Sequence, residues 1–220
     1  MAHLWKKARA VVFIMLGVYA VSFGAGFAAG KLGWTDAEKV RSSALAALNW
    51  DLENKVPVYG ALLRAYKAWE RPLLMRSIFQ GKVVRAMFII FLNNWVVADL
   101  TMNIRAGLIF PMVLYPVGRF AQGVAMARSP APLQTWMVWL TEFGGYFLTM
   151  TASLIAVLWT AFYRRFGFPS RRKALGRGAI VLGLAYLVSG LFFFVGSYAE
   201  TMLLLGRSLR LPGGRPLSWI

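Results

Sequence analysis

Five polar side chains interrupt an apolar stretch near the middle of the chain, and their types are those that bind ions, move protons or join helices. The stretch MFIIFLNNWVVADLTMNIRAG, residues 87–107, carries Asn93, Asn94, Asp99, Asn103 and Arg105. An Asp or Arg at mid-membrane costs about 2.5–3.5 kcal/mol, so such residues usually face other helices and have polar partners. Asp99 and Asn103 are one helical turn apart, and we expect their side chains to meet. Arg105 follows closely enough to bend back toward the acid or to reach the membrane surface.

Two further acids lie inside later apolar runs. Glu142 is found in WLTEFGGYFLTMTA, among small and hydroxylated residues that leave room for another helix or for water, and Glu200 in VGSYAETML. Membrane-embedded carboxylates can relay protons, but they can also pair with Arg105, Arg119 or backbone donors as structural anchors. Sequence spacing does not give the distance between Glu142 and Glu200, so both interpretations stay open.

Three hypotheses for this intramembrane polar network belong to different classes. In the leading one, Asn93 and Asn94 bond across helices, each bond stabilising by a few tenths to about 2 kcal/mol, and the protein is a non-catalytic subunit that scaffolds a larger assembly. In the second, the Asn, Asp and Glu side chains line the path of a small transporter or channel. In the third, the chain is an intramembrane enzyme that acts on a lipid or a cell-wall precursor.

The sequence lacks the common catalytic and metal-binding patterns. It has no cysteine, which excludes disulfides, thiolate metal sites and cysteine nucleophiles, and it has a single histidine, His3. An ordinary zinc or haem site therefore has no set of protein ligands within this chain. There is also no G-x-S-x-G, H-E-x-x-H or P-loop motif. We expect no catalytic residue, no metal site and no cofactor, and we expect that the protein is not an enzyme.

The composition is that of an integral membrane protein. The chain of 220 residues is 59% hydrophobic with a mean hydropathy of +0.57, which is too apolar for an ordinary water-soluble domain. Its formal net charge of +17 lies between the apolar runs. Lys and Arg beside spans are held on the cytoplasmic side, and acidic headgroups attract them by about 1 kcal/mol each. We therefore expect other membrane proteins and anionic lipids as partners, and no nucleic acid.

The first 30 residues predict an N-terminal transmembrane helix. Three basic residues precede an uncharged run over residues 10–30, close to the roughly 20 residues that cross a bilayer, so we expect a cytoplasmic N-terminus. A cleaved signal peptide is the rival interpretation, but this run is longer than the usual core of about 7–15 residues. Gly26 and Gly30 have the small-xxx-small spacing that lets two helix backbones approach closely.

Residues 31–81 mix polar and apolar side chains and predict an extramembrane or interfacial helical segment. Leu62, Leu63, Tyr66 and Trp69 fall at helical spacing on one side. That pattern suits a helix in the headgroup plane or against a partner, and it equally suits a helix that packs on the protein's own spans.

The rest of the chain predicts a four-span bundle over residues 82–206 and a short extramembrane tail over residues 207–220. The apolar runs cover residues 84–101, 106–127, 137–163 and 180–205. The loop YRRFGFPSRRKALGRG is the densest basic segment and should be cytoplasmic. Counting about five spans from a cytoplasmic N-terminus places this loop inside too. We expect an all-α polytopic bundle, with Gly118 and Gly123 at helix-packing positions.

The order of these features resembles the stage II sporulation protein M family. The segment IFLNNWVVADL is similar to the family's phenylalanine-x-asparagine-asparagine pattern, at Phe91, Asn93 and Asn94. The segment GLIFPMVLYPVGRFAQGVAMA resembles the glycine-punctuated helix after that motif. LTEFGGYFLTMTA is similar to the family's histidine-glycine-x-x-glutamate helix, with Glu142 at the glutamate and no histidine, and YAETML resembles the closing segment, with Glu200 near the end of the last helix.

The resemblance implies a polytopic component of a prokaryotic inner membrane. In the sporulation case, the family member is a partner of peptidoglycan-remodelling proteins during engulfment. The resemblance does not imply an enzyme, which agrees with the missing catalytic motifs.

Overall fold

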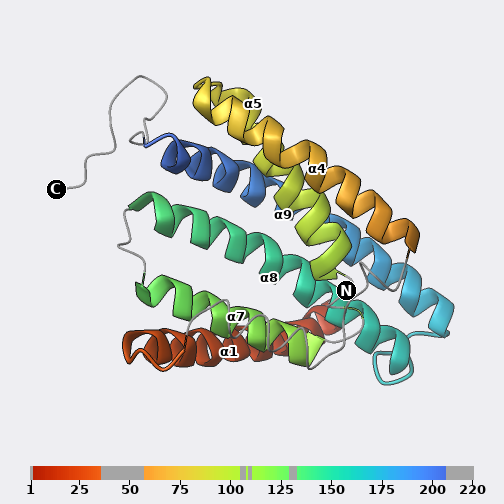
Figure 1. Ribbon diagram of the computed structural model, residues 1–220. Helices are drawn as coiled ribbons and strands as arrows, with labels where there is room; N and C mark the ends of the chain where they lie inside the picture. The colour runs from red at the N-terminus through yellow and green to blue at the C-terminus, as the bar shows by residue number, and fades with distance from the viewer. Residues whose placement is uncertain (1, 36–56, 105–107, 109–110, 129–132, 207–220) are drawn as a thin grey trace.

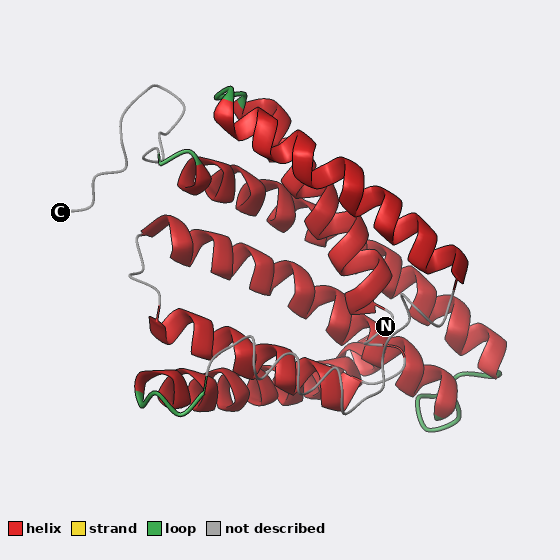
Figure 2. Ribbon diagram, in the orientation of Figure 1, coloured by secondary structure: helices red, strands yellow, loops and turns green. Residues whose placement is uncertain are grey.

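The computed structural model describes residues 2–35, 57–104, 108, 111–128 and 133–206. Most of these residues form helices, and none of them lies in a strand (Figure 2). The predicted all-α helical bundle is therefore confirmed. The predicted tail and residues 36–56 of the predicted interfacial segment lie outside the described residues.

The helices keep the labels of Figure 1. They are α1 (Ala2–Lys31), α4 (Pro57–Phe79), α5 (Val83–Leu92), the π-helix η1 (Asn93–Asn103), α7 (Pro111–Arg128), α8 (Leu133–Ala161) and α9 (Arg171–Leu204).

Four helical stretches in the described part of the chain are long and apolar enough to cross a membrane, as expected of a membrane protein. They are Ala8–Lys31, Val83–Leu100, Thr135–Ala161 and Arg171–Leu204. The remaining span expected from sequence, residues 106–127, corresponds to α7, which is not among the four. Helix α7 has 18 residues and contains Pro116 and Arg119. At about 1.5 Å per residue it is a little shorter than the hydrocarbon core of about 30 Å.

The bundle is built around α8. Helices α8 and α9 run antiparallel and are joined by a short turn, while α1 and α7 lie side by side on the other flank of α8 (Figure 1). The continuous rod of α5 and η1 packs against α9, and α4 lies along α5. Helix α4 thus packs on the protein's own helices, which is one of the two arrangements that the sequence allowed.

Glycines bring α1 and α7 together. A Cβ atom added to Gly26 would collide with the carbonyl oxygen of Phe120, and one added to Gly123 would collide with that of Phe23. A Cβ atom at Gly30 would lie 2.8 Å from that of Ala127. The small-xxx-small prediction and the packing role of Gly123 are therefore confirmed. The same prediction for Gly118 finds no support among the described residues, because none of their atoms lies within 4 Å of the space that its Cβ would fill.

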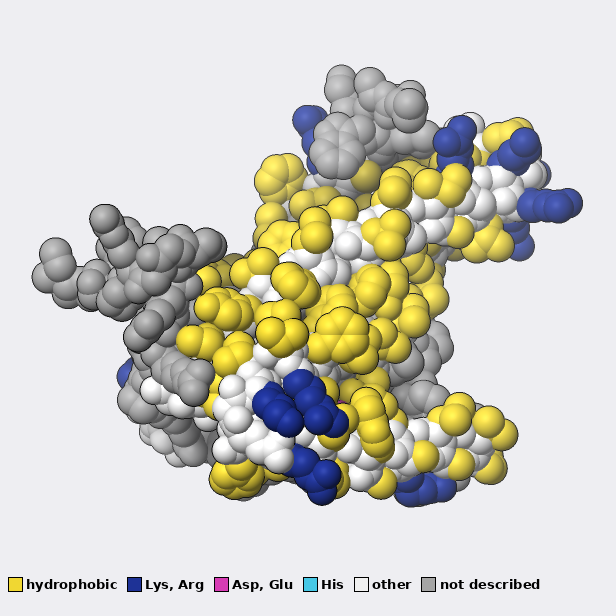
Figure 3. Space-filling view, turned by 90° about the horizontal axis from the view of Figure 1, so that it is seen from above, with side chains coloured by type: hydrophobic (Ala, Val, Ile, Leu, Met, Phe, Trp, Pro, Cys, Tyr) yellow, Lys and Arg dark blue, Asp and Glu magenta, His cyan; other side chains and the backbone are white. Residues whose placement is uncertain are grey.

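One end of the bundle gathers basic segments. Ala8 and Val11 of α1 belong to the same buried cluster as Trp159 of α8 and Ala174 of α9. The start of α1 and the basic turn between α8 and α9 therefore lie at the same end of the bundle (Figure 1). Elsewhere the visible surface is mostly hydrophobic, with Lys and Arg side chains gathered in a few clusters (Figure 3).

Candidate functional site

The amide–carboxylate cluster consists of Asn93, Asn94, Glu142 and Glu200. The Nδ2 atom of Asn94 lies 3.3 Å from Oε1 of Glu142 and 3.5 Å from Oε2 of Glu200, so one amide bridges α8 and α9. The Nδ2 atom of Asn93 donates to Oδ1 of Asn94 at 3.4 Å. Glu142 lies about two turns inside the start of its span and Glu200 about one turn inside the end of its own. The cluster therefore occupies the half of the bundle away from the basic turn.

The aspartate–hydroxyl cluster consists of Asp99, Thr149 and Ser189, whose side chains are fully buried. The Thr149 hydroxyl donates to Oδ1 of Asp99 at 2.6 Å, and the Ser189 hydroxyl donates to Oδ2 at 2.9 Å. Thr149 and Ser189 lie near the middle of their spans, where an acid without partners would be most costly. Each oxygen of this carboxylate thus meets a hydroxyl from a different helix.

The π-helix explains how one element serves both clusters. Asn94 and Asp99 are five residues apart, which in an α-helix would separate them by about 140° around the axis. In η1 the backbone bonds are i→i+5, as shown by the N–H of Ile104, which donates to the carbonyl of Asp99. Residues five apart then lie on successive turns, and both side chains reach α8 and α9. π-Helices are rare overall, but where they occur they are often found at functional sites.

The two partner helices keep ordinary α-helical spacing. Glu142 and Thr149 are seven residues apart on α8, close to two turns, and Ser189 and Glu200 are eleven apart on α9, close to three turns. Each helix therefore presents both of its polar groups on one face. Because α8 and α9 are antiparallel, the carboxylates meet at one level and the hydroxyls at another.

An aromatic pair fixes η1 against α9. The indole Nε1 of Trp95 donates to the carbonyl of Tyr186 at 3.0 Å, and the Tyr186 hydroxyl donates to the carbonyl of Trp95 at 3.4 Å. The two rings stack with their centroids 4.8 Å apart. Gly190 leaves room for the indole, since a Cβ there would lie 3.0 Å from it.

Charged groups on neighbouring helices surround the amide–carboxylate cluster. Arg119 of α7 lies within electrostatic reach of Glu142, and its guanidinium carbon is 5.9 Å from the ring centroids of Tyr19 and Tyr146. Glu70 of α4 lies within electrostatic reach of Glu200. The two carboxylates therefore face a cation on one side and a third acid on the other.

Glu70 and Tyr66 lie on α4, outside the four candidate spans. Burial raises the pKa of Glu70 above its usual 4.5, and the charge of Arg71 opposes that shift. Burial, followed by the charge of Glu70, raises the pKa of Tyr66 to about 12. The Tyr66 hydroxyl is buried and has no hydrogen-bond partner among the described residues. It remains protonated at neutral pH.

The structure brings together four of the seven residues predicted for the polar network. Asn93, Asn94, Glu142 and Glu200 meet in one cluster, and Asp99 occupies the second, where its described partners are hydroxyls of other helices rather than its helical neighbour. The side chain of Asn103 and all of Arg105 lie outside the described residues. The predicted contact of Asp99 with these two residues therefore stays a prediction.

Sequence reasoning missed three residues that complete the site. They are Trp95, Tyr186 and Ser189. A usable signal existed for Ser189, because a serine followed by glycine in the apolar run YLVSGLFFF leaves space for a partner helix. The Trp95–Tyr186 pair had no local signal, since its members are 91 residues apart.

Within the described part of the chain, no three acidic or histidine side chains come close enough to hold a metal ion. Comparisons with protein-family models, with curated proteins and with solved structures found no match to this chain.

Proposed function

We propose that this protein is a non-catalytic membrane subunit that scaffolds or stabilises a larger assembly. The observation that carries the proposal is that the intramembrane polar groups form hydrogen bonds between helices. The Asn94 amide donates to both Glu142 and Glu200 and so joins three helices, and Asp99 accepts hydrogen bonds from hydroxyls of two helices. Bonds of this kind hold helices at fixed positions, which is what a scaffold requires.

The proposal includes a location and an orientation. The basic residues at one end of the bundle support a cytoplasmic position for the start of α1 and for the turn between α8 and α9, because Lys and Arg next to spans are retained on that side. A prokaryotic inner membrane rests on the resemblance to the stage II sporulation protein M family, and so does membership of an assembly with other membrane proteins. That resemblance stays a prediction.

The absence of cysteine makes a clean test possible. Single cysteines at Phe88, which lines a groove of about 770 Å³ between α4 and α5, and at Leu187 on α9 would be cross-linked in native membranes. Both side chains are exposed, at 53% and 62%. The buried Met150 is the matched control position, and a cysteine there should give no adduct.

A scaffold should give reproducible heavier adducts from at least one exposed position, and it should co-purify with the same proteins in mild detergent. Purification as a lone monomer, together with no adduct from either exposed position, would contradict the proposal.

A second candidate function, a small transporter or channel, is favoured by one specific observation. Two intramembrane carboxylates from different helices share a single amide donor, and Glu70 extends this acidic group toward α4. Neighbouring carboxylates can pass a proton from one to the next.

Flux measurements separate the two candidates. In liposomes, a transporter should show a pH- or ion-dependent flux that Glu142→Gln abolishes, while Glu70→Gln lowers it less because Glu70 lies at the rim. The absence of flux in the parent protein, or an unchanged flux in Glu142→Gln, would leave the scaffold as the better proposal.

A further inference from the structure

We propose that the groove between the start of α1 and the end of α8 is a binding site for an anionic glycerophospholipid. In this site one acyl chain lies along the groove and the phosphate contacts Arg165. The proposal concerns a surface remote from the polar clusters and does not depend on the scaffold function.

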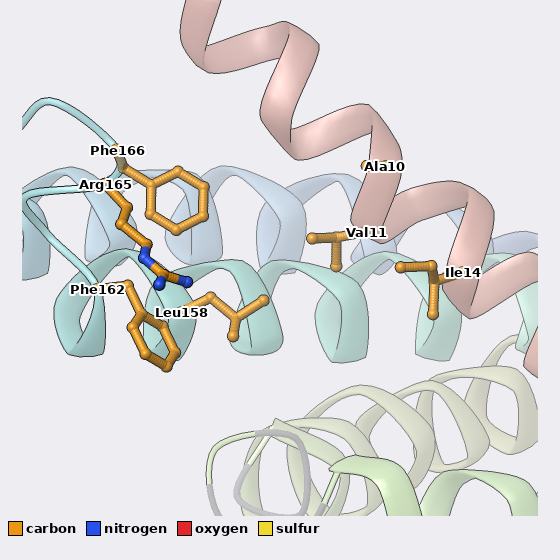
Figure 4. A pocket seen from close by; sticks show the side chains of 7 residues that line it. All are labelled: Ala10, Val11, Ile14, Leu158, Phe162, Arg165 and Phe166. Atoms are coloured by element: carbon orange, nitrogen blue, oxygen red, sulfur yellow. The ribbon is translucent and has the colours of Figure 1, made fainter.

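The groove has a volume of about 510 Å³, within the roughly 300–1,000 Å³ that small-molecule sites occupy (Figure 4). Val11 and Ile14 line it from α1, and Leu158 and Phe162 line it from α8. Ile14 and Phe162 are 55% and 49% exposed, so apolar side chains remain uncovered along the groove. These residues lie inside or directly beside the candidate spans, where a lipid tail is the surrounding solvent.

Arg165 places a positive charge at the end of this apolar surface. It follows the last residue of α8, Ala161, by four positions and lines the groove together with Phe166. Its guanidinium carbon lies 5.9 Å from the ring centroid of Phe162, so the aromatic ring orients the cation. In Figure 4 the guanidinium lies near the side chains of Leu158 and Phe162. A lipid whose tail lies in the groove would therefore have its phosphate close to the positive charge of Arg165.

The charge of the two contributing segments is complementary to a phosphate. Residues 1–30 and 156–180 contain no Asp or Glu. Their basic residues are Lys6, Lys7, Arg9, Arg164, Arg165, Arg171, Arg172, Lys173 and Arg177. An acidic headgroup would thus meet no negative side chain from the chain segments that form the groove.

Headgroup charge, rather than the tail, must determine the selectivity of this site. A lipid tail is as apolar as Leu, so moving it from the bilayer into the groove gains little from the hydrophobic effect. Each basic residue near the surface attracts an acidic lipid by about 1 kcal/mol, which corresponds to about a fivefold change in affinity. The site should therefore prefer phosphatidylglycerol to phosphatidylcholine with the same tails.

Native mass spectrometry of the full-length protein with equal amounts of these two lipids tests the proposal. Arg165→Gln should weaken the first phosphatidylglycerol bound by about fivefold. Arg172→Gln is the matched control, because it removes the same charge at the same end of the bundle from a residue that does not line the groove, and it should change binding by less than about twofold. Ala10→Trp fills the groove without changing any charge and should also weaken binding.

Equal binding of the two lipids would overturn the proposal. Equal losses in Arg165→Gln and Arg172→Gln would also overturn it, since they would indicate only a diffuse layer of charge. Full lipid binding by Ala10→Trp would show that the groove is not the site. A thermal melt of each variant confirms that the bundle is intact.

Discussion

Two joints of the bundle bring helices together by different means. In the α1–α7 joint, glycines let backbones touch, since Gly26 and Gly123 each face a carbonyl of the other helix. In the joint of η1, α8 and α9, side chains do the joining, through Asn94 with two carboxylates and Asp99 with two hydroxyls.

The difference shows what each joint can tolerate. Backbone atoms cannot move aside without bending a helix, so the glycine joint admits one geometry. Beside the polar clusters, the joint of η1, α8 and α9 also contains glycines, but side chains fill the space next to them, such as the ring of Phe192 beside Gly144 and the Thr141 hydroxyl beside Gly196. Gly178, nearer the basic turn, is the exception, since a Cβ there would lie 2.8 Å from the Cα of Ala156. Rings can change rotamer, and hydroxyls can find other acceptors. We therefore expect the glycine joint to be the more sensitive of the two.

The largest effect is expected for Gly26→Ala. Its new methyl group collides with the backbone of Phe120, and we expect the free energy of unfolding in detergent to fall by about 3 kcal/mol. Gly24→Ala is the control on the same helix, because no atom of the described part of the chain lies within 4 Å of its Cβ position. That variant should be neutral or more stable by up to about 1 kcal/mol, since Ala is the better helix former. Equilibrium unfolding of both variants that gave equal losses would refute the role of the glycine joint.

A smaller loss is expected for Asp99→Ala in the polar joint. Removing the acid abolishes two interhelical bonds of about 0.6–1.7 kcal/mol each, and we expect a loss of about 2 kcal/mol. The loss is limited because the Ser189 hydroxyl also lies 2.8 Å from the carbonyl of Tyr186, to which it can donate. Ser189→Ala, which abolishes one bond, should lose about 0.6 kcal/mol in the same unfolding assay. A greater loss for Asp99→Ala than for Gly26→Ala would reverse the comparison.

Gly144→Ala tests a glycine that faces an aromatic side chain rather than the backbone of another helix. A Cβ atom there would lie 2.6 Å from the ring of Phe192, but that ring is 37% exposed and can turn outward. A displaced rotamer costs about 0.5–1.5 kcal/mol, and the better helix propensity of Ala offsets much of it. We expect a net loss of about 0.5 kcal/mol or less. A loss of unfolding free energy as large as that of Gly26→Ala would show that the ring of Phe192 cannot move aside any more easily than backbone atoms can.

The smallest effect concerns pH and tests the burial of Glu70 on α4. The raised pKa of Glu70 means that the native state holds a proton that the unfolded state has released. The free energy of unfolding should therefore fall as the pH rises from about 4.5 through the raised native pKa, and then level off. Glu70→Gln should remove the part of this decline that Glu70 contributes and so make the profile shallower, whereas Arg64→Gln should leave the slope unchanged, because Arg stays charged throughout. An unchanged pH profile in Glu70→Gln would contradict the raised pKa of Glu70 in the native state.

Much of the fold could be predicted from local patterns. Hydropathy and length identified the spans, and the spacing of Gly26 and Gly30 identified a close helix contact. The expected count of spans depended on α7, which contains Pro116 and Arg119 and is not among the four strongly apolar stretches of the described residues. Gly118 and Gly123 have similar sequence surroundings. Only the packing shows that Gly123 touches α1, whereas no described atom lies within 4 Å of the Cβ position of Gly118.

The chemistry of the site divides in the same way. The sequence by itself determined that Asn94, Asp99, Glu142 and Glu200 need polar partners, because apolar spans cannot leave such groups facing lipid. Tertiary structure alone decided the partners, which come from helices 48 to 106 residues away in the case of Asn94. The shift to π-helical geometry in η1 moved Asn94 and Asp99 onto successive turns, where α-helical spacing would have separated them. Sequence periodicity indicates which face of a helix a residue occupies. A hydrogen bond between helices also requires that two faces lie close together, and only the packing of the bundle sets that distance.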